Sequence, residues 1–233
     1  MEGNRKILIV DNEDNIINIL GIYLKNSNYS VCEAINGKEA LILFEKINPS
    51  LVILDLNLPD IKGEELCISL RKKSMVPIII ATAKSKEEDI LNGFEIGADD
   101  YIIKPFNPKQ LVARVGMLLR RTDKEFNFQP DIISINQNEV TIDNLKHEVK
   151  KNGNIINFTF TEYNIFLMLV QNPDKVFSRE ELLKCVSKKQ NSLNDRIIDT
   201  HIKNIRHKIQ ICSMELIKTV RSNGYKFTGE TNL

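Results

Sequence analysis

Short apolar runs alternate with longer amphipathic stretches five times in the first half of the chain. Runs of this kind are typical of buried strands, whereas apolar residues spaced three and four apart indicate one face of a helix. Five successive strand–helix pairs predict an α/β fold with a doubly wound, five-stranded parallel sheet. Such a sheet has helices on both faces and a crevice at the carboxyl ends of its strands. The expected strands are residues 7–10, 29–34, 51–54, 78–81 and 101–103, and the expected helices are residues 15–26, 37–46, 63–72, 86–96 and 108–121.

The pattern changes after residue 121, where a polar stretch without periodicity predicts a linker. Short strand-like runs with Asn- and Gly-bearing turns follow, then three helical stretches and a hairpin. Thr159 stands three residues before Glu162, the spacing of a helix capping box. We therefore expect a first domain at 4–122, a linker at 123–129 and a small α+β domain at 130–230. In this second domain the expected strands are residues 132–135, 140–142, 147–150, 155–157, 217–221 and 225–228, and the expected helices are 161–171, 179–186 and 194–211.

The composition supports a globular protein. A length of 233 residues fits two ordinary domains, and 42% hydrophobic with 27% charged residues differs from a disordered chain. Because no run of about 18 apolar residues and no signal peptide is present, we expect no membrane span and no membrane partner. The four cysteines lie far apart without a CxxC pair, which favours free thiols and a reducing cytoplasm.

Polar side chains follow the expected strands at the points where the strands end. Because the carboxyl ends of parallel strands meet at one edge of a sheet, these side chains should converge. Carboxylates gathered in this way suit Mg²⁺, and a cation with an ammonium and a hydroxyl can stabilise a phosphoryl group moving onto a carboxylate. The implied chemistry is acyl-phosphate formation. The residues are Asp11, Asn12 and Glu13 after the first strand, Asp55 after the third, Thr82 after the fourth and Lys104 after the fifth.

Each of these residues alone has an ordinary explanation, since an Asp after a strand usually caps a turn and a Lys is usually solvated. Together with their neighbours, however, they form four motifs that resemble, in order and spacing, the receiver domain of bacterial response regulators. The resemblance covers roughly residues 4–122 and implies a flavodoxin-like fold. The motifs are ILIVDNE at residues 7–13, LDLNLPD at 54–60, IATA at 80–83 and GADDYIIKPF at 97–106.

The resemblance implies roles for the residues of the crevice. Asp55 would accept a phosphoryl group from a sensor histidine kinase, and Thr82 and Lys104 would contact the phosphoryl oxygens. Tyr101 would be the aromatic switch that turns inward when Thr82 moves, and the Lys104–Pro105 bond would be cis. Apart from accepting and losing its own phosphoryl group, the protein is not expected to be an enzyme.

The resemblance also implies a Mg²⁺ site. Asp11, Asp55 and the backbone carbonyl of Asn57 would be metal ligands. The family usually has a second acid directly after the first, whereas this chain has Asn12. The amide oxygen of Asn12 is able to coordinate, but the site loses one negative charge, so we expect weaker metal binding. Whether Glu13 compensates stays open at this point.

The resemblance further implies that activated receivers form homodimers through cross-dimer ion pairs. By position, Asp100 and Arg114 would supply one pair, and Asp99 with Arg121 would add to the same charged face. Because exposed ion pairs are worth only about 0–1 kcal/mol each, we expect a weak dimer that depends more on apolar contact.

The C-terminal part carries a basic stripe. Residues 201–226 contain six Lys and Arg side chains against one Glu, which suggests a polyanionic partner. Within the helical stretch 195–208, isoleucines line one face and polar side chains the other, the arrangement of a helix that reads the major groove of double-stranded DNA. A merely solvated basic face is the alternative. The candidate DNA-binding residues are Lys203, Asn204, Arg206 and His207 on the helix and Arg221 on the hairpin.

The surrounding motifs favour DNA binding. They resemble the effector domain of the OmpR/PhoB subfamily over about residues 130–229, which implies a winged helix, tandem DNA half-sites and contact with RNA polymerase. Two departures exist: Ser187–Lys188 replaces a frequent Trp–Gly pair, and Ser222 replaces the first glycine of the wing. The loop at 187–194 is therefore expected to differ in shape.

Two other functional classes compete. A phosphohydrolase of the haloacid dehalogenase type also uses an Asp nucleophile, a Thr and a Lys, but it needs a second Asp two positions later, where this chain has Asn57. A nucleotide- or flavin-binding domain would need a phosphate cradle after the first strand instead of acids. The sequence therefore predicts a transcription regulator controlled by phosphorylation.

Overall fold

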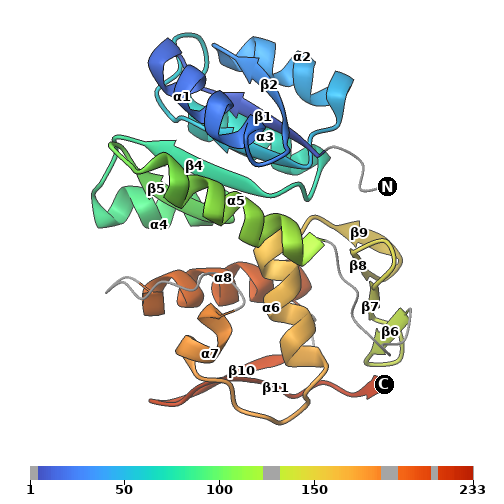
Figure 1. Ribbon diagram of the computed structural model, residues 1–233. Coiled ribbons are helices and arrows are strands. Elements are labelled where there is room, and N and C mark those ends of the chain that lie inside the picture. Colours follow the sequence, from blue (N-terminus) through green and yellow to red (C-terminus); the bar gives the residue numbers. More distant parts are fainter. Residues whose placement is uncertain (1–4, 123–131, 185–193, 211–214, 233) are drawn as a thin grey trace. The chain divides into compact units, whose positions relative to one another are not determined.

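The protein is described from a computed structural model that covers residues 5–122, 132–184, 194–210 and 215–232, with the side chains of 121, 122 and 194 left out. The chain divides into two compact units, residues 1–124 and 125–233. Each is described by itself below, as the N-terminal and the C-terminal unit (Figure 1).

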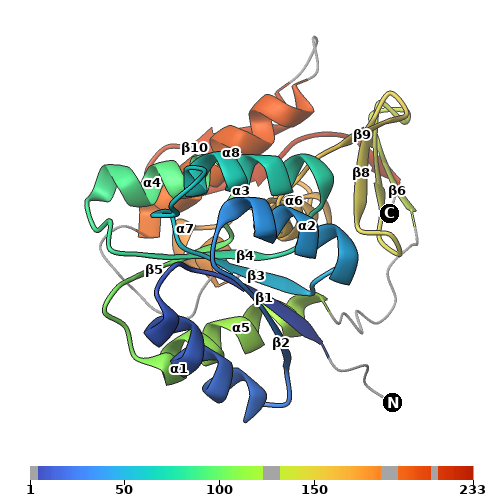
Figure 2. The ribbon, with the colours of Figure 1, turned by 90° about the horizontal axis from the view of Figure 1, so that it is seen from above.

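The N-terminal unit contains the predicted five-stranded parallel sheet in the order β2-β1-β3-β4-β5. Helices α1 and α5 cover one face, and α2, α3 and α4 cover the other (Figure 2). The predicted element ends are correct within two residues. The strands are β1 (Lys6–Val10), β2 (Ser30–Ala34), β3 (Leu51–Leu54), β4 (Ile78–Thr82) and β5 (Asp100–Ile103), and the helices are α1 (Asp14–Lys25), α2 (Gly37–Ile47), α3 (Gly63–Lys73), α4 (Glu87–Glu95) and α5 (Pro108–Thr122).

Burial explains why the apolar runs form this sheet. The central strands β1, β3 and β4 lie between two helical layers, so nearly all of their side chains are buried and their sequences show no alternation. The edge strand β2 is only half-buried, which accounts for its weaker apolar signal. Cys67 in α3 lies in the core, Cys32 in β2 is half-buried, and both are free thiols. The other two cysteines, at 185 and 212, lie outside the described residues.

The C-terminal unit has an antiparallel sheet in the order β12-β6-β7-β8-β9, three helices and a hairpin. Strand β12 (Thr231–Asn232), which pairs with β6, was not predicted and extends beyond the expected domain end at residue 230. Asn152 and Ser222 have positive φ angles of 48° and 63° in two of the turns. The remaining elements are β6 (Ile132–Ile135), β7 (Val140–Asp143), β8 (Glu148–Lys151), β9 (Asn154–Ile156), α6 (Phe160–Val170), α7 (Arg179–Leu183), α8 (Asn194–Ile209), β10 (Ile217–Val220) and β11 (Gly224–Phe227).

Helix α6 forms the centre of this unit and is buried on nearly all sides. Its predicted capping box is confirmed: the Glu162 backbone N–H donates to Thr159 Oγ1 (3.1 Å), and the Thr159 backbone N–H donates to Glu162 Oε2 (2.8 Å). The Lys208 ammonium of α8 pairs with the same carboxylate at 2.5 Å. The cap of α6 thereby fixes one end of α8. None of the helices in the described part of the chain is both long and apolar enough to span a bilayer.

Candidate functional sites

The sheet of the N-terminal unit brings the predicted acidic crevice together. The Asp55 backbone N–H donates to the Val10 carbonyl (2.8 Å), and the Lys104 backbone N–H donates to the Thr82 carbonyl (2.8 Å). The main-chain ladder therefore places the ends of β1 and β3, and those of β4 and β5, side by side. The Lys104–Pro105 bond is cis, as predicted.

Lys104 is the centre of the charged cluster. Its Nζ lies 2.8 Å from Asp11 Oδ2, 2.9 Å from Glu13 Oε1 and 2.8 Å from Asp55 Oδ2. Three carboxylates and one ammonium leave a formal charge of −2. Burial raises the pKa of Asp11 despite its hydrogen bond with Lys104. The pKa of Lys104 is also raised, because its bonds to the three carboxylates outweigh the effect of burial. With its three carboxylates ionised, the cluster carries more negative than positive charge.

This cluster suits a hard divalent cation. One oxygen from each of Asp11, Glu13 and Asp55 lies within 4.8 Å of the other two, and oxygen ligands are what Mg²⁺ prefers. Glu13 joins the cluster although the sequence left its part open. The side chain of Asn12, by contrast, is exposed and lines a neighbouring cavity of about 650 Å³ together with Asn57. The backbone N–H of Asn57 donates to Asp55 Oδ1 at 3.1 Å.

Thr82 carries a buried hydroxyl that a bound ligand could satisfy. Its side chain is 0% exposed, and its Oγ1 has no hydrogen-bond partner among the described residues. Buried hydroxyls are normally satisfied, so an exception calls for a physical reason. An oxyanion held beside Lys104 would be such a partner.

Tyr101 is buried in the structure. Its hydroxyl donates to the Lys84 carbonyl (2.9 Å), and its ring packs against Phe94 and beside Gly93. Burial raises the pKa of Tyr101, so the hydroxyl stays a donor. The Lys84 ammonium in turn pairs with Glu64 in α3 at 2.5 Å. Neither Lys84 nor Glu64 was singled out from the sequence, because only the fold brings them together.

The segment between β3 and α3 is fixed at both ends. A Cβ on Gly63 would lie 2.4 Å from Leu56 Cα and 2.6 Å from the Asp55 carbonyl oxygen, so only glycine fits there. Asp60 accepts hydrogen bonds from the backbone N–H groups of Gly37 (2.8 Å) and Lys38 (2.9 Å) at the start of α2. These bonds lower its pKa despite an opposing effect of desolvation. An Asp after Pro59 was a usable sequence signal for a cap, but its target was not readable.

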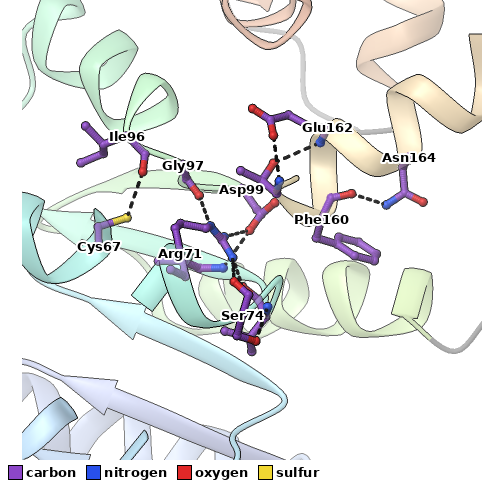
Figure 3. A network of polar contacts seen from close by, with 12 residues as sticks. Cys67, Arg71, Ser74, Ile96, Gly97, Asp99, Phe160, Glu162 and Asn164 are labelled. Atoms are coloured by element: carbon purple, nitrogen blue, oxygen red, sulfur yellow. Dashed lines mark hydrogen bonds and ion pairs between the residues drawn. The ribbon is translucent and has the colours of Figure 1, made fainter. Parts of the chain in front are cut away.

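One expected dimer residue lies elsewhere. Asp99 is 0% exposed and pairs with Arg71 of α3, which also donates to the Gly97 carbonyl at 2.6 Å (Figure 3). The Ile78 backbone N–H donates to the same carboxylate at 2.9 Å. The placement of Asp99 on a charged outer face was therefore wrong. Its carboxylate forms an ion pair inside the N-terminal unit with Arg71, which lies 28 positions earlier in the chain.

Two other expected dimer residues, Asp100 and Arg114, are paired with each other. They form an ion pair at 2.6 Å within one chain. Both side chains are largely buried, so a cross-dimer pair would require an exchange of partners. The side chain of Arg121 lies outside the described residues.

The outer face of α8 only partly matches the predicted DNA-reading surface. The isoleucine stripe is confirmed for Ile198, Ile202, Ile205 and Ile209, which are buried, whereas Ile197 is only half-buried. Lys203 and His207 are exposed, whereas Asn204 is half-buried. Arg221 is exposed at the hairpin turn, next to Ser222 in the left-handed conformation.

Arg206 does not point freely outward. Its Nε and Nη2 donate to the Ile217 carbonyl at 2.9 and 2.7 Å, and Nη2 also donates to Thr219 Oγ1 at 2.9 Å. The helical spacing predicted an outward side chain, but the hairpin folds back against that position. The contacts of Arg206 therefore do not support its assignment as a DNA-binding residue.

Family models match both units. The receiver domain of response regulators matches residues 7–116, and the C-terminal domain of transcriptional regulatory proteins matches residues 151–227. The Staphylococcus aureus transcriptional regulatory protein SrrA is 40% identical over 237 residues, which is 98% of each chain.

Solved structures give the same picture. A RitR mutant matches with a TM-score of 0.76 and 27% identity over 96% of this chain and 99% of that one. The response regulator DrrB of Thermotoga maritima, an OmpR/PhoB homologue, matches with a TM-score of 0.51 and 34% identity over 97% and 99%.

Proposed function

Because the chain belongs to the response regulators that join a receiver domain to a C-terminal transcriptional-regulatory domain, we propose that phosphorylation of Asp55 controls how it binds DNA. One observation carries the proposal. A buried carboxylate, an ammonium and a buried hydroxyl that has no partner among the described residues meet at one edge of the parallel sheet. That combination suits an acceptor, a positive charge and a donor for a phosphoryl group.

The acceptor step follows from these groups. A carboxylate oxygen of Asp55 attacks the phosphorus of a phosphohistidine on a sensor kinase, and the P–N bond breaks with its electron pair going to the imidazole nitrogen. Lys104, already 2.8 Å from Asp55 Oδ2, balances the charge on the transferred group. The Thr82 hydroxyl, which has no hydrogen-bond partner within the described part of the chain, donates to a phosphoryl oxygen.

We assign the metal site to Asp11, Glu13 and Asp55, with the carbonyl of Asn57 and the amide of Asn12 as further candidates. Mg²⁺ would supply charge neutralisation for the phosphoryl oxygens. Calorimetric titration with Mg²⁺ alone tests the assignment: Glu13→Gln should weaken binding, and Asn12→Asp should strengthen it. Unchanged affinity in Glu13→Gln would remove this residue from the site.

The phosphoacceptor is tested on the full chain with phosphoramidate and Mg²⁺, followed by mass spectrometry. The wild type should gain one phosphoryl group on Asp55, and Asp55→Asn should gain none. Asp14→Asn is the matched control, because it removes an exposed carboxylate from the start of α1. Phosphorylation of Asp55→Asn, or multiple turnover of p-nitrophenyl phosphate by the wild type, would contradict the proposal.

The partners that complete this function are a sensor histidine kinase, double-stranded DNA, RNA polymerase and a second copy of the chain, acting in the cytoplasm. We propose that phosphorylation favours a homodimer through α4, β5 and α5, which would place two tandem half-sites about 10–11 base pairs apart. Sedimentation with beryllofluoride tests the dimer. Arg114→Glu should weaken it, and an unchanged dimer constant would reject this surface.

A further inference from the structure

The hairpin of the C-terminal unit is attached to helix α8 at two separate places. The first is Tyr225 of β11, whose hydroxyl donates to Asp199 Oδ1 of α8 at 2.6 Å. The second is Arg206 of α8, which donates three hydrogen bonds to β10. Asp199 and Arg206 are seven residues apart, so their backbone positions lie about 10 Å apart along the helix axis. Two such points restrict rotation of the hairpin as well as its distance from the helix.

Tyr225 connects these attachments into one array. The guanidinium carbons of Arg179 and Arg206 lie 5.1 and 5.6 Å from the centre of its ring, within cation–π range. Arg179, the first residue of α7, also donates to Asp199 Oδ1 at 2.7 Å. Burial and the bond to Asp199 raise the pKa of Tyr225 to about 12, so its hydroxyl stays a donor.

The backbone strengthens the same array. Tyr225 and Phe177 exchange two main-chain hydrogen bonds of 2.9 Å each, which joins the hairpin to the segment before α7. A pair of contacts so close requires Gly224, because a Cβ there would lie 2.0 Å from the Phe177 carbonyl oxygen. Helix α7, helix α8 and the hairpin therefore meet at one residue.

We propose that Arg206 and Tyr225 are positioning residues, which hold the hairpin wing at a fixed place on α8 and make no contact with DNA themselves. The inference rests on the proposed function, since it presumes that α8 and the wing bind one duplex together. A helix in the groove and a wing on the backbone must fit simultaneously, so a preformed geometry saves the ordering cost at binding. The Arg206 fork is already used for the hairpin, which leaves the exposed Lys203, His207 and Arg221 to face the duplex.

The test compares charge with geometry. A duplex pool is first selected by the wild type from random DNA, and affinity is then measured over a range of salt concentrations. Each phosphate contact contributes about 0.9 to the slope of log affinity against log salt. Arg206→Lys keeps the charge but loses the planar fork, and Tyr225→Phe changes no charge. Lys203→Gln is the matched control that removes a positive charge from the same helix.

We expect Arg206→Lys and Tyr225→Phe to weaken binding to the selected duplex about tenfold or more with an unchanged salt slope. Lys203→Gln should make the negative slope shallower by about 0.9 if Lys203 contacts a phosphate. Hydrogen exchange without DNA should be faster at residues 217–227 in both positioning variants. Wild-type affinity in Arg206→Lys together with unchanged hydrogen exchange would overturn the proposal. A shallower salt slope in Arg206→Gln would also overturn it, because it would show that Arg206 contacts a phosphate.

The arms remain separable. If one variant is unfolded by circular dichroism, the other decides the matter, because they remove different contacts of the same array. If the wild type selects no duplex at all, the proposed function fails, whereas the exchange measurement still reports on the array.

Discussion

Replacing Thr82 by Val should make the unphosphorylated protein more stable. The Thr82 side chain is 0% exposed and its hydroxyl has no partner among the described residues. In the unfolded chain the same hydroxyl binds water, so folding loses that interaction without replacement. Mutational data place the cost of such an unsatisfied buried group at about 1–3 kcal/mol. Valine has nearly the same shape, so no cavity forms, and we expect a gain of about 1–2 kcal/mol in the free energy of unfolding.

The assay is thermal unfolding of the full chain followed by circular dichroism. The transition that shifts with beryllofluoride and Mg²⁺ identifies the receiver domain, and a gain of this size should raise its midpoint temperature by roughly 3–8 °C. Thr82→Ser is the matched control, because it keeps the hydroxyl and should show no gain. In the presence of beryllofluoride and Mg²⁺ the advantage of Thr82→Val should shrink, since only the wild type then gains a hydrogen bond.

Two results would refute the reasoning. If Thr82→Val is as stable as the wild type or less stable, the hydroxyl is satisfied in solution and its burial carries no cost. If the stability advantage is the same with and without beryllofluoride, the hydroxyl does not meet the phosphoryl group.

Three further predictions follow from the same structure. Asp60→Ala should reduce both Mg²⁺ affinity and phosphorylation rate, because it frees the loop that carries Asn57 from the start of α2. Asn36→Ala is the control, because it removes another cap of α2 and should lower only the free energy of unfolding, by about 0.5–2 kcal/mol. Equal Mg²⁺ affinity in both variants would contradict this role. Ser222→Gly should raise stability by about 0.5–1 kcal/mol in chemical denaturation, because residue 222 has a φ of 63° that glycine adopts without strain; a loss would show that Ser222 makes a compensating contact. Burial raises the pKa of Cys67 to about 11, so the unfolded thiol ionises first and its contribution to stability should fall from about pH 8.5 up to pH 11. Unfolding of Cys67→Ala across this range should lack that part of the decline, and a decline identical to that of the wild type would count against it.

The positions of Asp55 and Lys104 were predictable from the sequence because parallel sheets obey a simple geometric rule. Each residue follows an apolar run directly, and the carboxyl ends of such runs must meet. Glu13 was harder, since it lies three residues past the end of β1 and its direction depends on how α1 begins.

Long-range partners were not predictable in the same way. Helical spacing correctly identified the buried face of α8, but it assigned Arg206 to the outside because the hairpin that covers it is formed by residues 217–227. The prediction for Asp99 was wrong for the same reason, since its partner Arg71 belongs to α3, and β4 and α4 lie between the two residues in the chain. Periodicity reports which side of an element is apolar, whereas a polar residue's partner depends on the packing of other elements.

The close approach at Gly224 has a consequence for protein engineering. The hairpin is joined to the segment before α7 through the backbone of Phe177 and Tyr225, with no room for a side chain at position 224. A wing grafted from another regulator to alter DNA preference would therefore have to pair with the segment before α7 of this protein, to which its own sequence is not matched, even if its turn were ideal. Successful chimeras should exchange residues 177–179 and 217–227 together and keep the partners Asp199 and Arg206 on α8, so the smallest transferable part of this DNA-binding domain is discontinuous in sequence.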